Sequence, residues 1–502
     1  MASDSPAIGR SMAKGAAWMV AMRLAIRLIG LVSTIILARL LVPADFGLVA
    51  LATVFYAIIE LASQFSFDVM LIKEQKADRS YYDTAWTLSI LRGVGGAALL
   101  VAGAGLTADF FDDPRLESVV YVLALVAVAE GFVNVGIVDF RKELNFDREF
   151  RYLVSVKIAA FLVTIFLAFL LRSYWALVFG MFSGVIARLC LSYWMHPFRP
   201  RWSLAKWREI MNFSKWLLFT NFIGIFRDRG ATFVVGKIGG AETLGLFLVA
   251  HEIATLATSE LAAPIRRAVL PGYAKLAGDA NRLKEVYLDG LSLTIMAALP
   301  IAAGIGLTAD LLVPIFLGAK WLAAIPIIQI LVIRGVLEVC LANTQPLVNA
   351  MGHPHLNTHV QSIAMVCEVP LLIFFTLEWG AHGAAAAVAV GAGTLVITYS
   401  IVLSRLIAVG WNDLLGAVWR SLFAVAVMTL AVFAVSETWV PSDAMPWLIL
   451  KLAVEVAVGA VVYTATHLAV WRLCGSPTGA ESYVLAALRS ASTRLALAKS
   501  TG

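Results

Sequence analysis

Long apolar runs, separated by short polar or Gly/Pro-containing stretches, follow one another along most of the chain. A helix that crosses a bilayer needs about 20 apolar residues, and runs of this length predict membrane-spanning helices rather than strands. They lie near 15–41, 46–70, 82–107, 117–139, 150–171, 174–195, 209–236, 243–264, 287–312, 321–349, 357–378, 382–407, 414–436 and 446–472. The pattern predicts an all-α integral membrane protein with fourteen transmembrane helices, and twelve is the fallback count.

Composition agrees with this interpretation. Of the 502 residues, 60% are hydrophobic and 14% are charged, whereas an ordinary soluble domain has about 25% charged residues. These values exclude a water-soluble fold of this size, a disordered chain and a secreted disulfide scaffold. No cleavable signal peptide is expected, because the first apolar run is long and carries Arg23 and Arg27.

Basic residues predict the orientation of the chain, because Lys and Arg concentrate on cytoplasmic loops. With the N-terminus inside, twenty-three of the 39 Lys and Arg fall on inner segments, four on outer loops and twelve within spans. Both termini are therefore expected to be cytoplasmic. The basic residues are spread over seven inner segments and suit an anionic leaflet, so nucleic-acid binding is not expected.

A short internal repeat suggests how the spans are grouped. Residues 38–48 and 236–246 align without a gap at an offset of 198, so that Gly47-Leu48 meets Gly245-Leu246. Both copies end a predicted inside-to-outside span, which is the parallel-repeat arrangement of many transporters. We expect two pseudo-symmetric six-helix lobes at 1–205 and 206–410 that enclose a central cavity. Two further spans at 411–473 and a cytoplasmic tail at 474–502, with an amphipathic helix near 483–497, complete the chain.

Arginines inside the spans need an explanation, because a charge at the bilayer centre costs several kcal/mol. Arg23 and Arg27 lie four residues apart on one face of the first span, where they either reach the inner interface or line a wet cavity. In the seventh span, Arg227, Asp228 and Arg229 form either an internal ion pair or part of that cavity. Arg334 in the tenth span has Glu338 one turn away, so the two can pair.

Other ionisable residues offer further candidates. Glu60, His251 and Glu252 fall within predicted spans, where the His251-Glu252 pair provides either ion coupling or an ordinary polar contact. A metal site at the closely spaced histidines 353, 355 and 359 is not expected, since no acidic partner is near. No GxxxxGK[ST], HExxH or GxSxG motif occurs, so neither a cofactor nor an enzymatic activity is expected.

The stretch 35–52, IILARLLVPADFGLVALA, resembles the signature of polysaccharide-biosynthesis membrane proteins, which are Wzx-type oligosaccharide flippases of the multidrug/oligosaccharidyl-lipid/polysaccharide (MOP) exporter superfamily. The segments 140–146 (FRKELNF) and 244–254 (LGLFLVAHEIA) fit the same family, in the same order. The resemblance implies fourteen spans, two lobes and alternating access in the bacterial inner membrane. The implied substrate is an oligosaccharide linked to undecaprenyl pyrophosphate, moved from the inner to the outer leaflet for exopolysaccharide or lipopolysaccharide synthesis.

The arginines within the spans favour this substrate class, because a guanidinium matches phosphate oxygens with paired hydrogen bonds. We expect Arg23, Arg27, Arg227, Arg229 and Arg334 to contact the pyrophosphate, with Asp228, Glu60, His251 and Glu252 in coupling or ion pairing. The alternative is a MATE-like drug or metabolite exporter. A membrane polysaccharide polymerase is disfavoured because no large outer loop is present. Expected partners are the lipid-linked oligosaccharide, membrane lipid and the polymerase or export machinery.

Overall fold

The computed structural model describes the backbone of residues 5–62, 70–71, 74, 77–276, 278–439, 444–477 and 479–482. The side chains of 5–14, 16–17, 58–62, 212–228, 256–257, 259–271 and 274 are not described. Throughout this described part, every regular element is a helix, as predicted. The chain divides into two compact units, Met1–Gly245 and Leu246–Gly502, and the predicted lobe boundaries stay a prediction.

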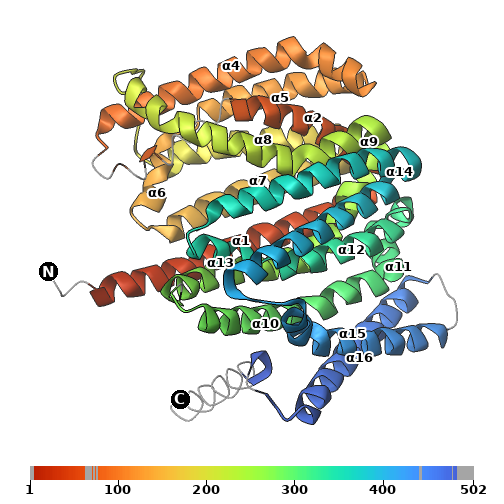
Figure 1. The fold of residues 1–502 in the computed structure, drawn as a ribbon. Helices are drawn as coiled ribbons and strands as arrows, with labels where there is room; N and C mark the ends of the chain where they lie inside the picture. Colours follow the sequence, from red (N-terminus) through yellow and green to blue (C-terminus); the bar gives the residue numbers. More distant parts are fainter. Residues whose placement is uncertain are drawn as a thin grey trace, which may run out of the picture. The chain divides into compact units, whose positions relative to one another are not determined.

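The first unit is a bundle of long helices joined mostly by short turns (Figure 1). The pairs α4/α5 and α7/α8 pack most extensively, α1 lies against α7, and α5 lies against α8. Its elements are α1 (Ser5–Leu40), α2 (Pro43–Ala62), α4 (Arg79–Phe111), α5 (Arg115–Gly131), η1 (Val135–Val138), α6 (Asp139–Lys142), α7 (Phe146–Leu171), α8 (Trp175–Met195) and the first part of α9 (Trp207–Leu276).

The second unit begins within α9 and has its own buried core. In that core α10 packs against α12 and α15, with Tyr273, Tyr287 and Leu291 at the centre. Its other elements are α10 (Ala280–Leu307), α11 (Ala309–Leu312), η2 (Val313–Leu317), η3 (Ala319–Trp321), α12 (Ala324–Cys340), α13 (Thr344–Ala350), α14 (Pro354–Ile407), α15 (Trp411–Glu437) and α16 (Met445–Leu473).

The described helices are long and apolar enough for a membrane. Ten meet the length and hydropathy expected of a span, and eleven do so if α5 and the bent η1–α6 segment count as one. Large apolar side chains cover much of their surface; Leu106, Phe166 and Leu430, for example, are each about two-thirds or more exposed. Such a surface suits lipid rather than water.

Some backbone features of the first unit recur in the second at a similar spacing. The helices α4 and α10 each start at an aspartate whose carboxylate accepts a backbone N–H, namely Asp78 and Asp279. The helix α1 ends at Leu40. The backbone of α9 departs from helical geometry at Gly240, where φ is 73°. Other residues with positive φ recur at a spacing of 206 to 208 residues, namely Asp112 and Gly318, Leu144 and Gly352, and Arg172 and Gly380.

The two repeat copies also meet one another within the first unit. A methyl group on Gly47 of α2 would lie 1.6 Å from the Ala241 carbonyl oxygen, and one on Gly245 of α9 would lie 1.8 Å from the Pro43 carbonyl oxygen. Pro43 and Ala241 are themselves 198 residues apart, so the two contacts are reciprocal. Only glycine permits this approach of two helix backbones.

Replacing Gly47 by alanine should therefore destabilise the protein by about 1–3 kcal/mol, the usual cost of overpacking. Gly95→Ala is the matched control, because a methyl group on Gly95 in α4 meets nothing within 4 Å and alanine favours a helix. Thermal unfolding of both purified variants tests this expectation. Equal melting temperatures for Gly47→Ala and the wild type would show that α2 and α9 leave room for a methyl group at Gly47.

Candidate functional site

An ion pair lies among the membrane helices of the first unit. Arg188 of α8 donates through Nη1 to Glu130 near the end of α5. The Tyr56 hydroxyl of α2 donates to the other carboxylate oxygen at 3.2 Å, and the Arg188 carbonyl accepts from Tyr152 of α7 at 3.2 Å. Four helices thus converge on one charged contact. The Arg188 side chain keeps 41% of its surface exposed.

A second polar cluster lies in the second unit, on α9, α12 and α14. Arg334 Nε of α12 donates to Glu338 Oε1 at 2.8 Å. The charges of these two residues act on both His251 of α9 and Glu368 of α14. A methyl group on Gly391 would lie 2.4 Å from Glu368 Oε2. The Glu368 carboxylate, in the first half of α14, therefore contacts the second half of the same helix. Each unit thus contains its own cluster of charged side chains among its membrane helices.

The structure places the predicted substrate residues in different units. Arg23 and Arg27 are half-buried on α1, and Arg229 is exposed on α9, all in the first unit, whereas Arg334 is half-buried in the second. His251 and Glu252 are half-buried on the second part of α9. Arg227, Asp228 and Glu60 lie outside the residues whose side chains are described.

Three contacts are not evident from sequence: one ion pair and two ring contacts between histidines. Glu130 and Arg188 are 58 residues apart, and only the packing of α5 on α8 brings them together. The sequence did show one sign of this contact, namely that Glu130 and Arg188 each lie within a predicted membrane span. His353, His355 and His359 pack ring against ring, edge on, and the described residues contain no group of metal-ligating side chains of the kind that holds an ion.

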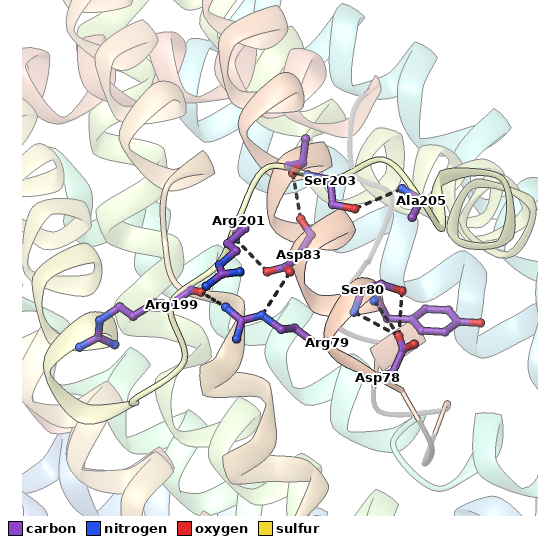
Figure 2. A network of polar contacts seen from close by, with 10 residues as sticks. Asp78, Arg79, Ser80, Asp83, Arg199, Arg201, Ser203 and Ala205 are labelled. Carbon is purple, nitrogen blue, oxygen red and sulfur yellow. Dashed lines mark hydrogen bonds and ion pairs between the residues drawn. The ribbon is translucent and has the colours of Figure 1, made fainter.

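A polar strap joins α8 to α9 in the first unit. This strap, residues 196–206, is mostly extended and crosses the start of α4 (Figure 2). Three α4 side chains accept its backbone N–H groups: Asp83 from Arg201 at 2.8 Å, Thr87 from Ser203 at 3.0 Å, and Thr84 from Lys206 at 3.3 Å. Nearly all the surface of these three side chains is buried. They satisfy backbone donors that no strand partner meets.

Two arginines complete the strap. Arg79 donates through Nη2 to the Arg199 carbonyl at 2.9 Å and lies 3.5 Å from the Asp83 carboxylate. Arg199 donates to the carbonyls of Tyr193 and His196 at 2.9 and 2.7 Å, which satisfies acceptors at the end of α8. The link from α8 to α9 is therefore held by specific contacts rather than left as a free loop.

His196 begins the strap in a defined protonation state. Its Nδ1 accepts the Phe198 N–H at 3.3 Å, and its Nε2 lies 3.5 Å from Asp139 Oδ2. An Nδ1 that accepts must carry no proton, so the ring is neutral. Burial lowers the His196 pKa from its usual 6.5, although Asp139 opposes the change.

Comparison with known proteins gives the family context for these features. Residues 36–326 match a family model described as polysaccharide biosynthesis protein. The chain is 25% identical over 332 residues to the lipopolysaccharide biosynthesis protein WzxC of Escherichia coli K12, covering 64% of this chain and 67% of that protein. It is 22% identical over 357 residues to the teichuronic acid biosynthesis protein TuaB of Bacillus subtilis 168, covering 70% and 74% of the two chains.

Solved structures show the same fold. The lipid II flippase MurJ, in an inward-closed conformation, superposes with a TM-score of 0.70 at 14% identity, covering 90% of this chain and 99% of that one. An inward-facing multidrug-resistance MATE family transporter of the MOP superfamily superposes with a TM-score of 0.56 at 16% identity, covering 77% and 98%. The resemblance predicted from residues 35–52 is confirmed.

Removing Arg188 alone should cost more stability than removing the whole ion pair. Arg188→Met leaves Glu130 among apolar helices without its charged partner, and we expect a loss of about 1–3 kcal/mol. Arg188→Met combined with Glu130→Leu should recover most of that loss. Thermal melts of both single variants and the double variant measure the coupling, and strictly additive losses would show that the two side chains do not interact.

Acid should weaken the strap through His196. Because the His196 pKa is lowered in the folded protein, the unfolded chain binds a proton more readily as pH falls through about 6.5. The stabilisation by neutral His196 is therefore present above that pH and lost below it. Melting temperatures of the wild type and His196→Gln, compared at pH 7.5 and 5.0, test this. A wild type that loses no more stability than the variant would contradict it.

Proposed function

Because the chain belongs to the family of polysaccharide biosynthesis proteins, we propose that it is a flippase for a lipid-linked oligosaccharide in the bacterial inner membrane. It moves a polyprenyl-pyrophosphate-linked oligosaccharide from the inner to the outer leaflet by alternating access. The observation that carries the proposal is the retention of arginine side chains among apolar helices in both units, at Arg188 and Arg334. An anionic head group gives such costly charges a function.

Fourteen spans with both termini cytoplasmic form part of the same proposal. The breaks at Gly240 in α9 and Gly380 in α14 divide each into two apolar helices. Counting both parts of each, together with the short apolar α2, raises the eleven candidate helices of the described chain to fourteen. An even number returns the C-terminus to the side of the N-terminus, which the basic inner loops place in the cytoplasm.

In this mechanism the arginines neutralise the pyrophosphate while the sugar moves through water and the prenyl tail stays in lipid. Arg23, Arg27 and Arg229 of the first unit and Arg334 of the second are the proposed contacts, since guanidinium groups bind phosphate oxygens in pairs. Arg334 already holds the Glu338 carboxylate, which a pyrophosphate displaces as it binds. No covalent bond is made or broken, so the protein acts as a transporter without a cofactor.

Coupling is proposed for the charged cluster of the second unit. The charges of Arg334 and Glu338 act on His251 in this cluster. An anion that moves past Arg334 therefore changes the electrostatic potential at His251. The neighbouring Glu252 is the second coupling candidate, and the polymerase and export machinery would receive the flipped saccharide. A MATE-like exporter of cations is the less favoured alternative, because Glu130 and Glu338 are engaged by arginines.

Arg27→Ala and Arg229→Ala should each abolish polysaccharide export while leaving the amount of protein in the membrane unchanged. Each removes a positive charge that the pyrophosphate needs. Arg405→Ala, at an exposed arginine in the last turn of α14, is the matched control and should export normally. Surface polysaccharide and membrane-protein level are measured in cells that lack the native gene. Normal export by both variants would refute the assignment of these two residues.

A further inference from the structure

The chain turns back on itself immediately after its last membrane helix. Gly475 and Ser476 both have positive φ, at 84° and 52°, and reverse the direction of the backbone after α16. The indole Nε1 of Trp471 donates to the Pro477 carbonyl at 3.1 Å and fixes the reversal. Gly479 and Ser482 then form a tight turn. As a result, a short tail segment, residues 479–482, returns to the helices α15 and α16, where Glu481 contacts Arg420 and His467.

This segment inserts a carboxylate between two basic side chains of different helices. The Glu481 carboxylate lies 2.9 Å from Arg420 Nε of α15 and 3.3 Å from His467 Nε2 of α16. The three side chains are 1%, 14% and 6% exposed, in that order. A buried arginine and a buried histidine that face one anion form a built anion site, which we call the C-terminal seat.

Glu481 fits the C-terminal seat poorly. Only one hydrogen bond forms, from Arg420 Nη2 to Glu481 Oε2 at 3.3 Å, where an arginine and a carboxylate normally form two shorter ones. Arg420 Nε and His467 Nε2 both face Glu481 Oε1, at 2.9 and 3.3 Å, without the alignment of a hydrogen bond, and His467 Nδ1 is buried without a hydrogen-bond partner. Such groups cost free energy, so an anion with more acceptor oxygens would satisfy this site better than the tail does.

Acidic side chains lie beside the C-terminal seat. Asp289 of α10 lies close enough to Glu481 and Glu285 for their like charges to repel, and its Oδ1 is 3.5 Å from the position of a methyl group on Gly479. The nearby acids oppose any anion in the seat, whereas Arg420 and His467 attract it.

The position of the seat indicates where its ligand comes from. Arg420 lies nine residues after Trp411, the start of α15, and His467 lies six residues before the end of α16. The two helices pack against each other, and at about 1.5 Å per residue the seat lies within about 14 Å of the end that they share. A phosphate lies outside the roughly 30 Å of hydrocarbon, so a lipid phosphate reaches the seat only from the end that these two helices share.

We propose that Arg420 and His467 bind a phosphate group of a membrane lipid, and that Glu481 fills this seat as a built-in competitor. When the tail segment leaves, the phosphate enters; when the phosphate leaves, Glu481 returns. The phosphate belongs either to an anionic phospholipid or to the polyprenyl pyrophosphate, and the second source rests on the proposed function. Binding is measured apart from export, so the seat and the flippase activity can fail separately.

Native mass spectrometry of the purified full-length protein tests the competition. The protein is titrated with phosphatidylglycerol, with a polyprenyl pyrophosphate, and with diacylglycerol as the phosphate-free control. Glu481→Gln removes the competing charge and should tighten binding of one phosphate lipid by about tenfold, the gain from one charge-assisted hydrogen bond. Arg420→Gln combined with Glu481→Gln should abolish that gain, and diacylglycerol binding should not change. The lipid that responds identifies the source.

The proposal fails if Glu481→Gln binds both phosphate lipids as the wild type does, or if the double variant keeps the gain. An equal gain with diacylglycerol also overturns it, because the tail would then merely cover an apolar groove. Hydrogen exchange on the unmodified protein provides a test that needs no variant to fold. Backbone amides of residues 479–482 should exchange faster when the phosphate lipid is added, and unchanged exchange would show that no competition occurs.

Discussion

A charge that enters the hydrocarbon of a bilayer loses its hydration, and the protein must supply the missing interactions. This cost accounts for the way charged side chains are arranged among the helices of this chain. Each described arginine pair joins a guanidinium to a carboxylate, as in Arg188–Glu130, Arg334–Glu338 and Arg420–Glu481. Two of these pairs join different elements, so the same contacts that stabilise charge also hold helices together. A transporter of anions can use them, because an incoming phosphate competes with the carboxylate.

The backbone obeys the same constraint. Its polar groups must be hydrogen-bonded within the membrane, so irregular backbone is confined to short breaks, as at Gly240 within α9 and Gly380 within α14. Where irregular backbone does extend, in the strap, α4 side chains accept its N–H groups. The close approach at Gly47 and Gly245 shows the complementary solution, in which two helix backbones contact each other directly because neither has a side chain there.

Hydropathy and loop charge were enough to predict an all-helical membrane protein, because bilayer thickness sets the length of each apolar run. The 198-residue repeat could also be recognised in the sequence, because the close backbone contact requires a glycine in both copies, at Gly47 and Gly245. Side-chain pairing was not visible. Glu130 and Arg188 come from separate runs, and sequence spacing does not show which helix faces lie together. Likewise, nothing in the tail composition indicated that Glu481 folds back onto Arg420. The predicted helix at 483–497 lies outside the described residues.

The central claim is that this chain carries a lipid-linked oligosaccharide across the membrane. The most direct measurement follows that lipid in cells from which the gene has been deleted, using an enzyme that attacks only saccharides exposed on the outer face. The account predicts that the lipid-linked saccharide accumulates in a form that the enzyme cannot reach, and that the intact gene restores access. A deletion strain whose saccharide reaches the outer face as quickly as that of the parent would contradict the account.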